Sequence, residues 1–196
     1  AVSLAPTVAE VLAALATAFE RVGCRWYLFG AQAAIVWGRP RLSADIDITV
    51  DVPIEGALEL ARVLESYGFG LRAGVTNHLI ETTRVLPIVH RATGFPVDAV
   101  LAGPGLEQQF LDRVRRVTIG DREIPIASAE DVIVTKMLAG RAKDLEDVRG
   151  ILQQGTDALD VEYIRETLLV LERALSRSDL LRELDAELAR VRRESL

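Results

Sequence analysis

The chain has few of the residues that build cysteine- or histidine-based sites. It contains one cysteine, Cys24, and two histidines, His78 and His90, among 196 residues. A single cysteine excludes an internal disulfide and a cysteine-built zinc site, and it is typical of a reducing compartment. Neither histidine has a partner at metal-ligand spacing, so we expect both to be structural. We expect Cys24, beside Trp26 in an apolar run, to be a buried and inert thiol.

Long apolar runs and an excess of positive charge are also missing. No apolar stretch approaches the roughly 20 residues that span a bilayer, and the N-terminus lacks the features of a secretory signal. We therefore expect a cytoplasmic protein with no membrane partner. The net charge of −6 and the pI of about 5.1 disfavour non-specific binding along nucleic acid. A local basic cluster, Arg113, Arg115 and Arg116, still leaves room for a basic groove.

The length is that of one ordinary domain, or of a domain with a small appendage, and the 49% hydrophobic and 27% charged residues are typical of a soluble globular protein. A capping box, Thr7-x-x-Glu10, is expected to open the first helix, and Gly23 to end it. Periodicity and turn residues predict the following elements up to residue 127: a strand at 25–29, a short helix at 30–38, a strand at 45–51, a helix at 55–67, strands at 83–91 and 95–101 joined as a hairpin, and a β segment at 116–127 with a turn at Gly120-Asp121.

The pattern changes at Ser128, which we expect to cap a helix. From there to Leu196 only helical periodicity is found, with breaks at Gly140 and near Gly155. The sequence thus predicts an α/β (α+β) fold: a small mixed β-sheet flanked by helices over residues 1–127, and a C-terminal helical region over 128–196. We expect this region to pack on the core as a lid or cleft wall.

Aspartates alternate with apolar residues in "DIDITVD". On a strand, residues i and i+2 share a face about 6.6 Å apart, so Asp45 and Asp47 are expected to point the same way. Two such anions repel each other unless a cation lies between them. Mg²⁺ fits, because it takes a few carboxylates and leaves positions for substrate phosphates. An edge strand with a solvated polar face is the alternative.

A third carboxylate lies on a later strand. Asp98 stands between Val97 and Ala99 in "GFPVDAVL", where a half-buried strand would ordinarily carry an apolar residue. A pair of metals about 3.5–4 Å apart needs such a third ligand, so we expect Asp98 to complete the cluster. Asp51, which comes shortly before Pro53, is expected to be a turn residue outside it.

Gly30 lies at the junction of a strand and a helix in "YLFGAQAA". A helix N-terminus presents free N–H groups and a partial positive charge that suit a phosphate, and glycine permits close approach. A glycine that serves only for packing at a tight turn is the alternative. Its position 15 residues before Asp45 favours a triphosphate-binding turn beside a metal-binding strand.

Together these residues resemble a known superfamily. Gly30-Ala31, then Arg41-x-Ser43-x-Asp45-Ile46-Asp47, then Asp98 are similar to the polymerase-β-type nucleotidyltransferases, and most of all to minimal bacterial members related to abortive-infection toxins. The phrase "AEDVIVTKMLAGRAKDLEDV" also resembles that group. The resemblance covers most of residues 26–150.

The resemblance implies transfer of a nucleoside monophosphate from an NTP to a hydroxyl. It implies that Asp45, Asp47 and Asp98 bind two Mg²⁺ ions, with Asp98 also available as general base. Gly30 and the N–H of Ala31 would hold the β- and γ-phosphates. The family usually has glycine or serine where this chain has Ala31, which removes a hydroxyl contact. A weak or inactive nucleotide-binding module is therefore the alternative function.

Further nucleotide contacts are expected from residues outside the strands. Arg41 and Ser43 precede the metal strand, and Arg41 either contacts phosphate or pairs with the carboxylates when metal is absent. Lys136, among buried neighbours, would reach the triphosphate. Asp144 either orients Lys136 or caps the next helix.

The acceptor is left open as an RNA, a protein or a small molecule, and an antitoxin protein is a further expected partner if the chain is a toxin.

Overall fold

The structure is a computed structural model that describes residues 4–155 and 158–194. Its first helix, α1 (Pro6–Val22), ends at Gly23 as predicted, in the left-handed conformation. The predicted capping box is wrong, because the N-cap is Ala5 and Thr7 lies inside the helix. Pro6 occupies the first turn instead, where its fixed φ and missing N–H are tolerated.

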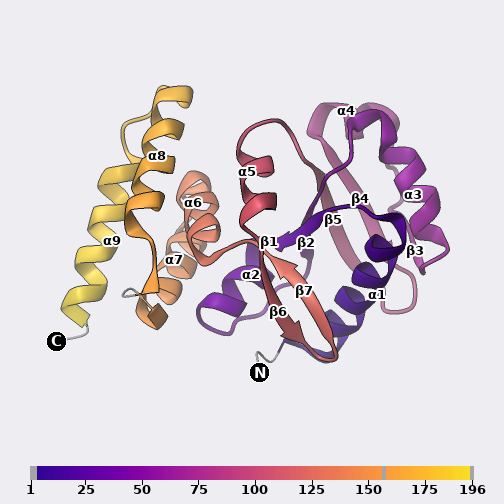
Figure 1. Ribbon diagram of the computed structural model, residues 1–196, viewed down its shortest axis with the longest axis horizontal. Helices are drawn as coiled ribbons and strands as arrows, with labels where there is room; N and C mark the ends of the chain where they lie inside the picture. Colours follow the sequence, from indigo (N-terminus) through magenta and orange to yellow (C-terminus); the bar gives the residue numbers. More distant parts are fainter. Residues whose placement is uncertain (1–3, 156–157, 195–196) are drawn as a thin grey trace. The chain divides into compact units, whose positions relative to one another are not determined.

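A seven-stranded mixed sheet forms the core of the α/β region, in the order β3-β4-β5-β2-β1-β7-β6 (Figure 1). Neighbouring strands are antiparallel except for the pairs β2–β5 and β1–β7, which are parallel. This confirms the predicted mixed sheet flanked by helices. The strands are β1 (Trp26–Phe29), β2 (Ile46–Val50), β3 (Phe69–Leu71), β4 (Val85–His90), β5 (Phe95–Leu101), β6 (Arg115–Ile119) and β7 (Arg122–Ile126).

Helices cover both faces of this sheet, because consecutive strand residues point to opposite sides. Trp26 of β1 packs on Phe19 of α1, with ring centroids 5.2 Å apart. The next residue, Tyr27, contacts Phe110 at a centroid distance of 6.5 Å. Phe110 belongs to α5, so α1 and α5 lie on opposite faces. The helices of this region are α2 (Gly30–Trp37), η1 (Ile54–Gly56), α3 (Ala57–Glu65), α4 (Asn77–Thr83) and α5 (Leu106–Arg113).

The predicted hairpin and the predicted turn at Gly120-Asp121 are confirmed. β4 and β5 pair from Val85↔Val100 to His90↔Phe95, and β6 and β7 meet at Ile119↔Arg122, around the turn Gly120-Asp121. Three short elements, β3, α4 and α5, were not predicted. β3 has only three residues, and α4 and α5 bury only one and two residues, too few to define an apolar period.

The C-terminal region consists of α6 (Ala129–Ala139), α7 (Ala142–Gly155), α8 (Val161–Leu175) and α9 (Leu180–Glu194). Ser128 caps α6 as predicted, with its side chain accepting the N–H of Asp131. Gly140 ends α6 in the left-handed conformation. No helix within the described ranges combines the length and apolar character needed to cross a membrane.

Contacts divide the chain into two compact units. The α/β unit contains residues 1–32 and 42–127, and the helical unit contains residues 33–41 and 128–196. Residues 33–41 therefore group with helices that follow them by nearly 100 positions. Two glycines permit this approach: a Cβ on Gly38 would lie 3.0 Å from the nitrogen of Ile151, and one on Gly150 would lie 3.3 Å from the nitrogen of Arg39.

Candidate nucleotidyl-transfer site

Gly30 has no room for a side chain. It joins β1 to α2 with φ = +66°, in the left-handed region that favours glycine. A Cβ built at this position would lie 2.0 Å from Oδ2 of Asp47. Because real Cβ atoms do not approach an oxygen so closely, the carboxylate of Asp47 occupies the space that any other residue at position 30 would need.

Asp47 and Asp98 are neighbours across two parallel strands. They are register partners in the pairing of β2 with β5, so their side chains share a face and their backbones are about 4.8 Å apart. Both side chains are half-buried. The structure thus brings together the glycine turn and two of the three predicted carboxylates, all within the α/β unit.

The carboxylate of Asp98 is ion-paired with Arg72. About a third of each side chain is exposed, 31% for Asp98 and 38% for Arg72. Sequence reasoning missed Arg72, which follows the three-residue strand β3, 26 positions before Asp98. Its only signal was a basic residue directly after the apolar stretch "FGL".

Asp45 directly precedes β2 and is exposed. The hydroxyl of Ser43 donates a hydrogen bond to Oδ1 of Asp45 at 2.9 Å, and the side-chain amide of Gln32 donates to its backbone oxygen at 3.3 Å. Ser43, which was expected to contact nucleotide, therefore contacts Asp45, which was expected to bind metal. The metal role of Asp45 and the nucleotide roles of Ser43 and Ala31 stay predictions.

Asp51 has a structural environment apart from these groups. It accepts hydrogen bonds from Nε and Nη2 of Arg25 at 2.9 and 2.8 Å. The side chain of Gln108 donates a third at 2.8 Å. The Gln108 bond first, and then the bonds from Arg25, hold the pKa of Asp51 below its ordinary value. Asp51 thus connects the end of β2 to α5, as a residue outside the predicted cluster.

The donor set fits a divalent metal with few protein ligands. Among the residues that the structure describes, no three His, Cys, Asp or Glu side chains converge on one ion position. Asp47 and Asp98 nevertheless form a pair of hard oxygen donors on one face, and Mg²⁺ is commonly held by one or two carboxylates, with water and phosphate completing its shell. These two residues would hold such an ion.

In the helical unit, Arg41, Lys136 and Asp144 form one ionic network with Asp147, in which Lys136 and the two carboxylates are buried. Nζ of Lys136 lies 2.8 Å from Asp147 and 3.2 Å from Asp144. Arg41 donates two hydrogen bonds to Asp147, at 2.7 and 2.9 Å, and Arg141 pairs with Asp144 at 2.5 Å. Asp144 is fully buried and Asp147 nearly so.

Bonding in this network outweighs burial. Burial raises the pKa of Asp147, but hydrogen bonds from Arg41 and Lys136 lower it further, so that it lies below its ordinary value. The same balance, with Arg141 and Lys136 as donors, lowers the pKa of Asp144. Sequence reasoning missed Asp147 as the partner of Arg41, 106 positions away. A phosphate contact by Arg41, Lys136 or Asp144 stays a prediction.

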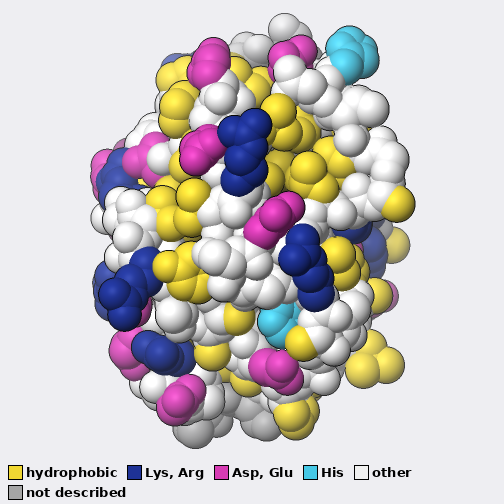
Figure 2. Space-filling view, turned by 90° about the vertical axis from the view of Figure 1, so that its right-hand side faces the viewer, with side chains coloured by type: hydrophobic (Ala, Val, Ile, Leu, Met, Phe, Trp, Pro, Cys, Tyr) yellow, Lys and Arg dark blue, Asp and Glu magenta, His cyan; other side chains and the backbone are white. Residues whose placement is uncertain are grey.

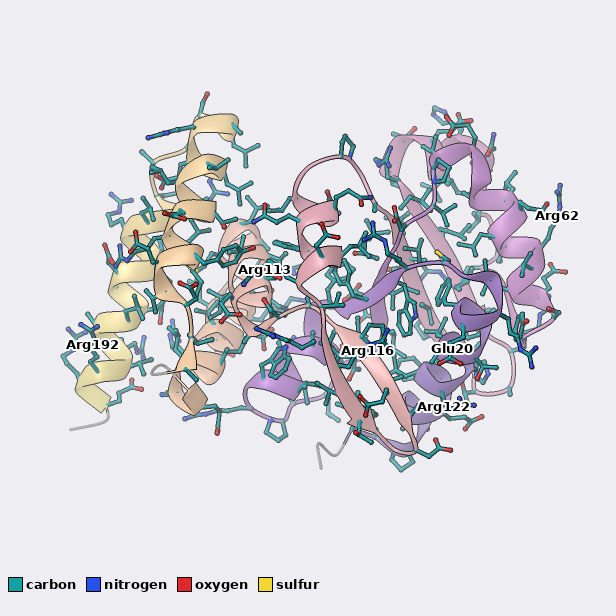
Figure 3. The ribbon with its side chains drawn as sticks, viewed as in Figure 1. Glu20, Arg62, Arg113, Arg116, Arg122 and Arg192 are labelled. Atoms are coloured by element: carbon teal, nitrogen blue, oxygen red, sulfur yellow. The ribbon has the colours of Figure 1, made fainter. Side chains whose placement is uncertain are left out.

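The basic cluster at residues 113–116 does not form one continuous surface. Arg113 ends α5, whereas Arg115 and Arg116 lie on β6 (Figure 3). Because consecutive strand residues point to opposite faces, the side chains of Arg115 and Arg116 diverge. A basic groove on either face of β6 would therefore contain only one of these two arginines.

The sequence model of one family matches residues 7–180, and that family is described as a nucleotidyltransferase of unknown function (DUF6036). The chain belongs to this family. It is accordingly a nucleotidyltransferase, in agreement with the resemblance in its motifs. The glycine turn and the paired aspartates lie inside the matched range. No curated protein matches the chain.

Solved structures with the same fold include two of the antibiotic-resistance factor ANT(2'')-Ia. The solution structure has a TM-score of 0.62 at 16% identity over 88% of this chain and 97% of the other. The crystal structure, in complex with adenylyl-2''-tobramycin, has a TM-score of 0.59 at 14% identity over 86% and 99%. A nucleotidyltransferase-like protein from Paracoccidioides brasiliensis has a TM-score of 0.55 at 17% identity over 91% and 92%. These similarities show a shared fold.

Proposed function

We propose that the protein transfers a nucleoside monophosphate from an NTP to an acceptor hydroxyl in a Mg²⁺-dependent reaction. The observation that carries this proposal is the contact of Gly30 with the carboxylate of Asp47, which is itself the register neighbour of Asp98. A turn that can approach phosphate and two carboxylates on one face are the parts that nucleotidyl transfer needs.

Each residue has a distinct proposed task. The N-terminus of α2 at Gly30 and Ala31 holds the triphosphate through backbone N–H groups. Asp47 and Asp98 would hold the metal, with Asp45 as a further proposed ligand, and the metal would supply charge neutralisation at the phosphates and a more acidic acceptor hydroxyl. Asp98 also accepts the proton of that hydroxyl. With Ala31 the backbone N–H contact to phosphate is retained, whereas a serine hydroxyl contact is lost.

The acceptor is proposed to be a hydroxyl of an RNA, a protein or a small molecule. Figure 2 looks onto the face of the α/β unit that carries α3 and α4. On this face, basic and acidic side chains are interspersed with apolar ones, and the described residues show no basic track of the kind that follows a polyanion. An acceptor panel should therefore include tobramycin and protein as well as tRNA.

The decisive experiment compares three aspartates in and beside β2. We expect the purified chain to release pyrophosphate and label an acceptor from Mg²⁺ and an NTP, and Asp47→Asn to lose at least about a hundredfold in rate, since a catalytic metal contributes several kcal/mol. Asp45→Asn should lose activity as well. Asp51→Asn is the matched control, because Asp51 pairs with Arg25 outside the site.

Full activity in both Asp47→Asn and Asp45→Asn would exclude this mechanism. Tight NTP binding without pyrophosphate release across the whole panel would instead identify the inactive nucleotide-binding module. We expect Asp51→Asn to remain active and to lose less than about 1 kcal/mol of stability. This result would show that removing a charge near β2 is not by itself what abolishes activity in the other two variants.

The proposal includes a role as a toxin restrained by an antitoxin protein. It predicts that induced expression of the chain arrests growth, and that Asp47→Asn removes the arrest. Normal growth with an enzymatically active chain would eliminate the toxin role and leave the transfer reaction in place.

A further inference from the structure

Arg72 reaches Asp98 across three strands. It follows β3 at one edge of the sheet, and its backbone N–H donates to the oxygen of Pro87 on β4 at 3.1 Å. Pro87 is in turn the register partner of Asp98. The backbone therefore places Arg72 so that one strand, β4, lies between it and the strand that carries the carboxylate with which it pairs.

The site needs a cation beside Asp98. Asp47 and Asp98 are direct cross-strand neighbours, and like charges in that relation destabilise a sheet. The guanidinium of Arg72 neutralises one of the two carboxylates. A divalent metal bound to the same carboxylate would provide the same neutralisation, and its ligand shell would take the oxygen that Arg72 now contacts.

We propose that Arg72 is the resident counter-cation of Asp98, and that a divalent metal must displace it in order to bind. This inference rests on the proposed function, in which Asp98 is a metal ligand. It adds a regulating residue: Arg72 lowers the affinity of the site for metal, and it partly neutralises the two carboxylates when no metal is bound.

The sheet order separates Arg72 from the triphosphate turn. Asp98 is on β5 and Asp47 on β2, while Gly30 follows β1 on the far side from β3. Arg72 therefore competes for the carboxylate of Asp98 and not for the space in front of Gly30.

The size of the effect follows from the exposure of the pair. Both side chains are about one-third exposed, so solvent screens their attraction. The free energy that such an ion pair contributes lies at the upper end of the range for surface ion pairs. Removing Arg72 should therefore tighten metal binding about fivefold. Because salt screens such pairs, the difference between wild type and variant should shrink at about 1 M salt.

The test is a titration of the full chain with Mn²⁺ alone, without nucleotide, followed by electron paramagnetic resonance. We expect Arg72→Ala to bind Mn²⁺ about fivefold more tightly than wild type. Arg72→Lys, which retains the positive charge, should lie nearer to wild type. The control is Arg62→Ala: Arg62 lies on α3, pairs with Glu59 and is 74% exposed (Figure 3), and its loss changes the net charge equally.

Mn²⁺ binding by Asp98→Asn distinguishes a failure of this inference from a failure of the proposed function. Weaker Mn²⁺ binding in Asp98→Asn with an unchanged affinity in Arg72→Ala would overturn the role of Arg72 and leave Asp98 as a ligand. Unchanged binding in Asp98→Asn would overturn both. If Arg62→Ala tightened Mn²⁺ binding as much as Arg72→Ala, the effect would be one of net charge, and the proposal would be overturned. Arg72→Ala retains its backbone N–H bond to Pro87, and a thermal melt verifies its fold.

Discussion

At the scale of single residues, the space around Gly30 is the sharpest feature of the site. Many glycines in this chain have positive φ, yet Gly30 is the one whose added Cβ would collide with a predicted catalytic carboxylate. Conformation and contact can therefore be tested separately, because other glycines have the same φ in open surroundings.

We predict that Gly30→Ala abolishes both nucleotidyl transfer and Mn²⁺ binding. The left-handed backbone strains any alanine by about 1–2 kcal/mol, and the new methyl group must also displace the carboxylate of Asp47. Urea unfolding, Mn²⁺ titration and the labelling assay measure the three effects.

Gly94→Ala is the matched control, since Gly94 has φ = +68° and nothing within 4 Å of an added Cβ. It should lose a similar amount of stability but retain activity. Equal activity in the two variants would show that the contact of Gly30 with Asp47 has no catalytic consequence.

At the scale of elements, α6 and α7 are joined through the buried carboxylates of Asp144 and Asp147. Lys136 of α6 lies between the two carboxylates of α7. Both carboxyl groups have a lowered pKa, because bonding to Lys136 and to arginines outweighs burial. The helix pair therefore depends on these groups remaining ionised.

We predict that the protein loses stability in acid through this network. A lowered pKa means that the unfolded state binds more protons than the folded state, so the stabilisation is complete above the unfolded pKa, near 3.8, and is lost as the pH falls through the folded value. Urea unfolding midpoints of wild type should thus fall more steeply below about pH 5 than those of Asp147→Asn.

Asp147→Asn should itself cost about 2 kcal/mol near neutral pH, because it leaves the buried Lys136 with one partner. Asp185→Asn is the control in the same unit: its partner is Arg165, and 56% of its side chain is exposed. Parallel pH profiles of wild type and Asp147→Asn would contradict the assignment.

At the scale of the whole molecule, the division of the chain into units is not collinear with its sequence. Residues 33–41 group with the helices beyond residue 128. Arg41 finds its partner in Asp147, and Gly38 packs against Gly150 and Ile151. The segment between Gly30 and β2 therefore makes these contacts with the C-terminal region.

We predict that a fragment of residues 1–127 leaves residues 33–41 unprotected. Hydrogen exchange followed by mass spectrometry should show protection of a peptide over 33–41 in the full chain, and its loss in the fragment. A peptide over β1, which pairs within the α/β unit, reports whether the fragment folds. Equal protection of 33–41 in both chains, with β1 protected, would contradict the grouping.

The sequence by itself determined the local features. The hairpin of β4 and β5, the cap at Ser128 and the stop at Gly140 all follow from patterns within a few residues. The strand expected at 45–51 is β2, but it begins at Ile46, so Asp45 lies just before it. Gly30-Ala31, the string Arg41-x-Ser43-x-Asp45-Ile46-Asp47, Asp98 and the phrase "AEDVIVTKMLAGRAKDLEDV" together indicated the superfamily, and the matched family model agrees with it.

Only the tertiary structure decided which charged groups pair. Arg72 meets Asp98 from 26 positions away and Arg41 meets Asp147 from 106, and no local period encodes such distances. Register in the sheet and packing of helices bring these groups together. The physical reason is that a carboxylate which is buried or lies beside another carboxylate costs free energy unless a cation pairs with it. The fold alone determines which cation is close enough to do so.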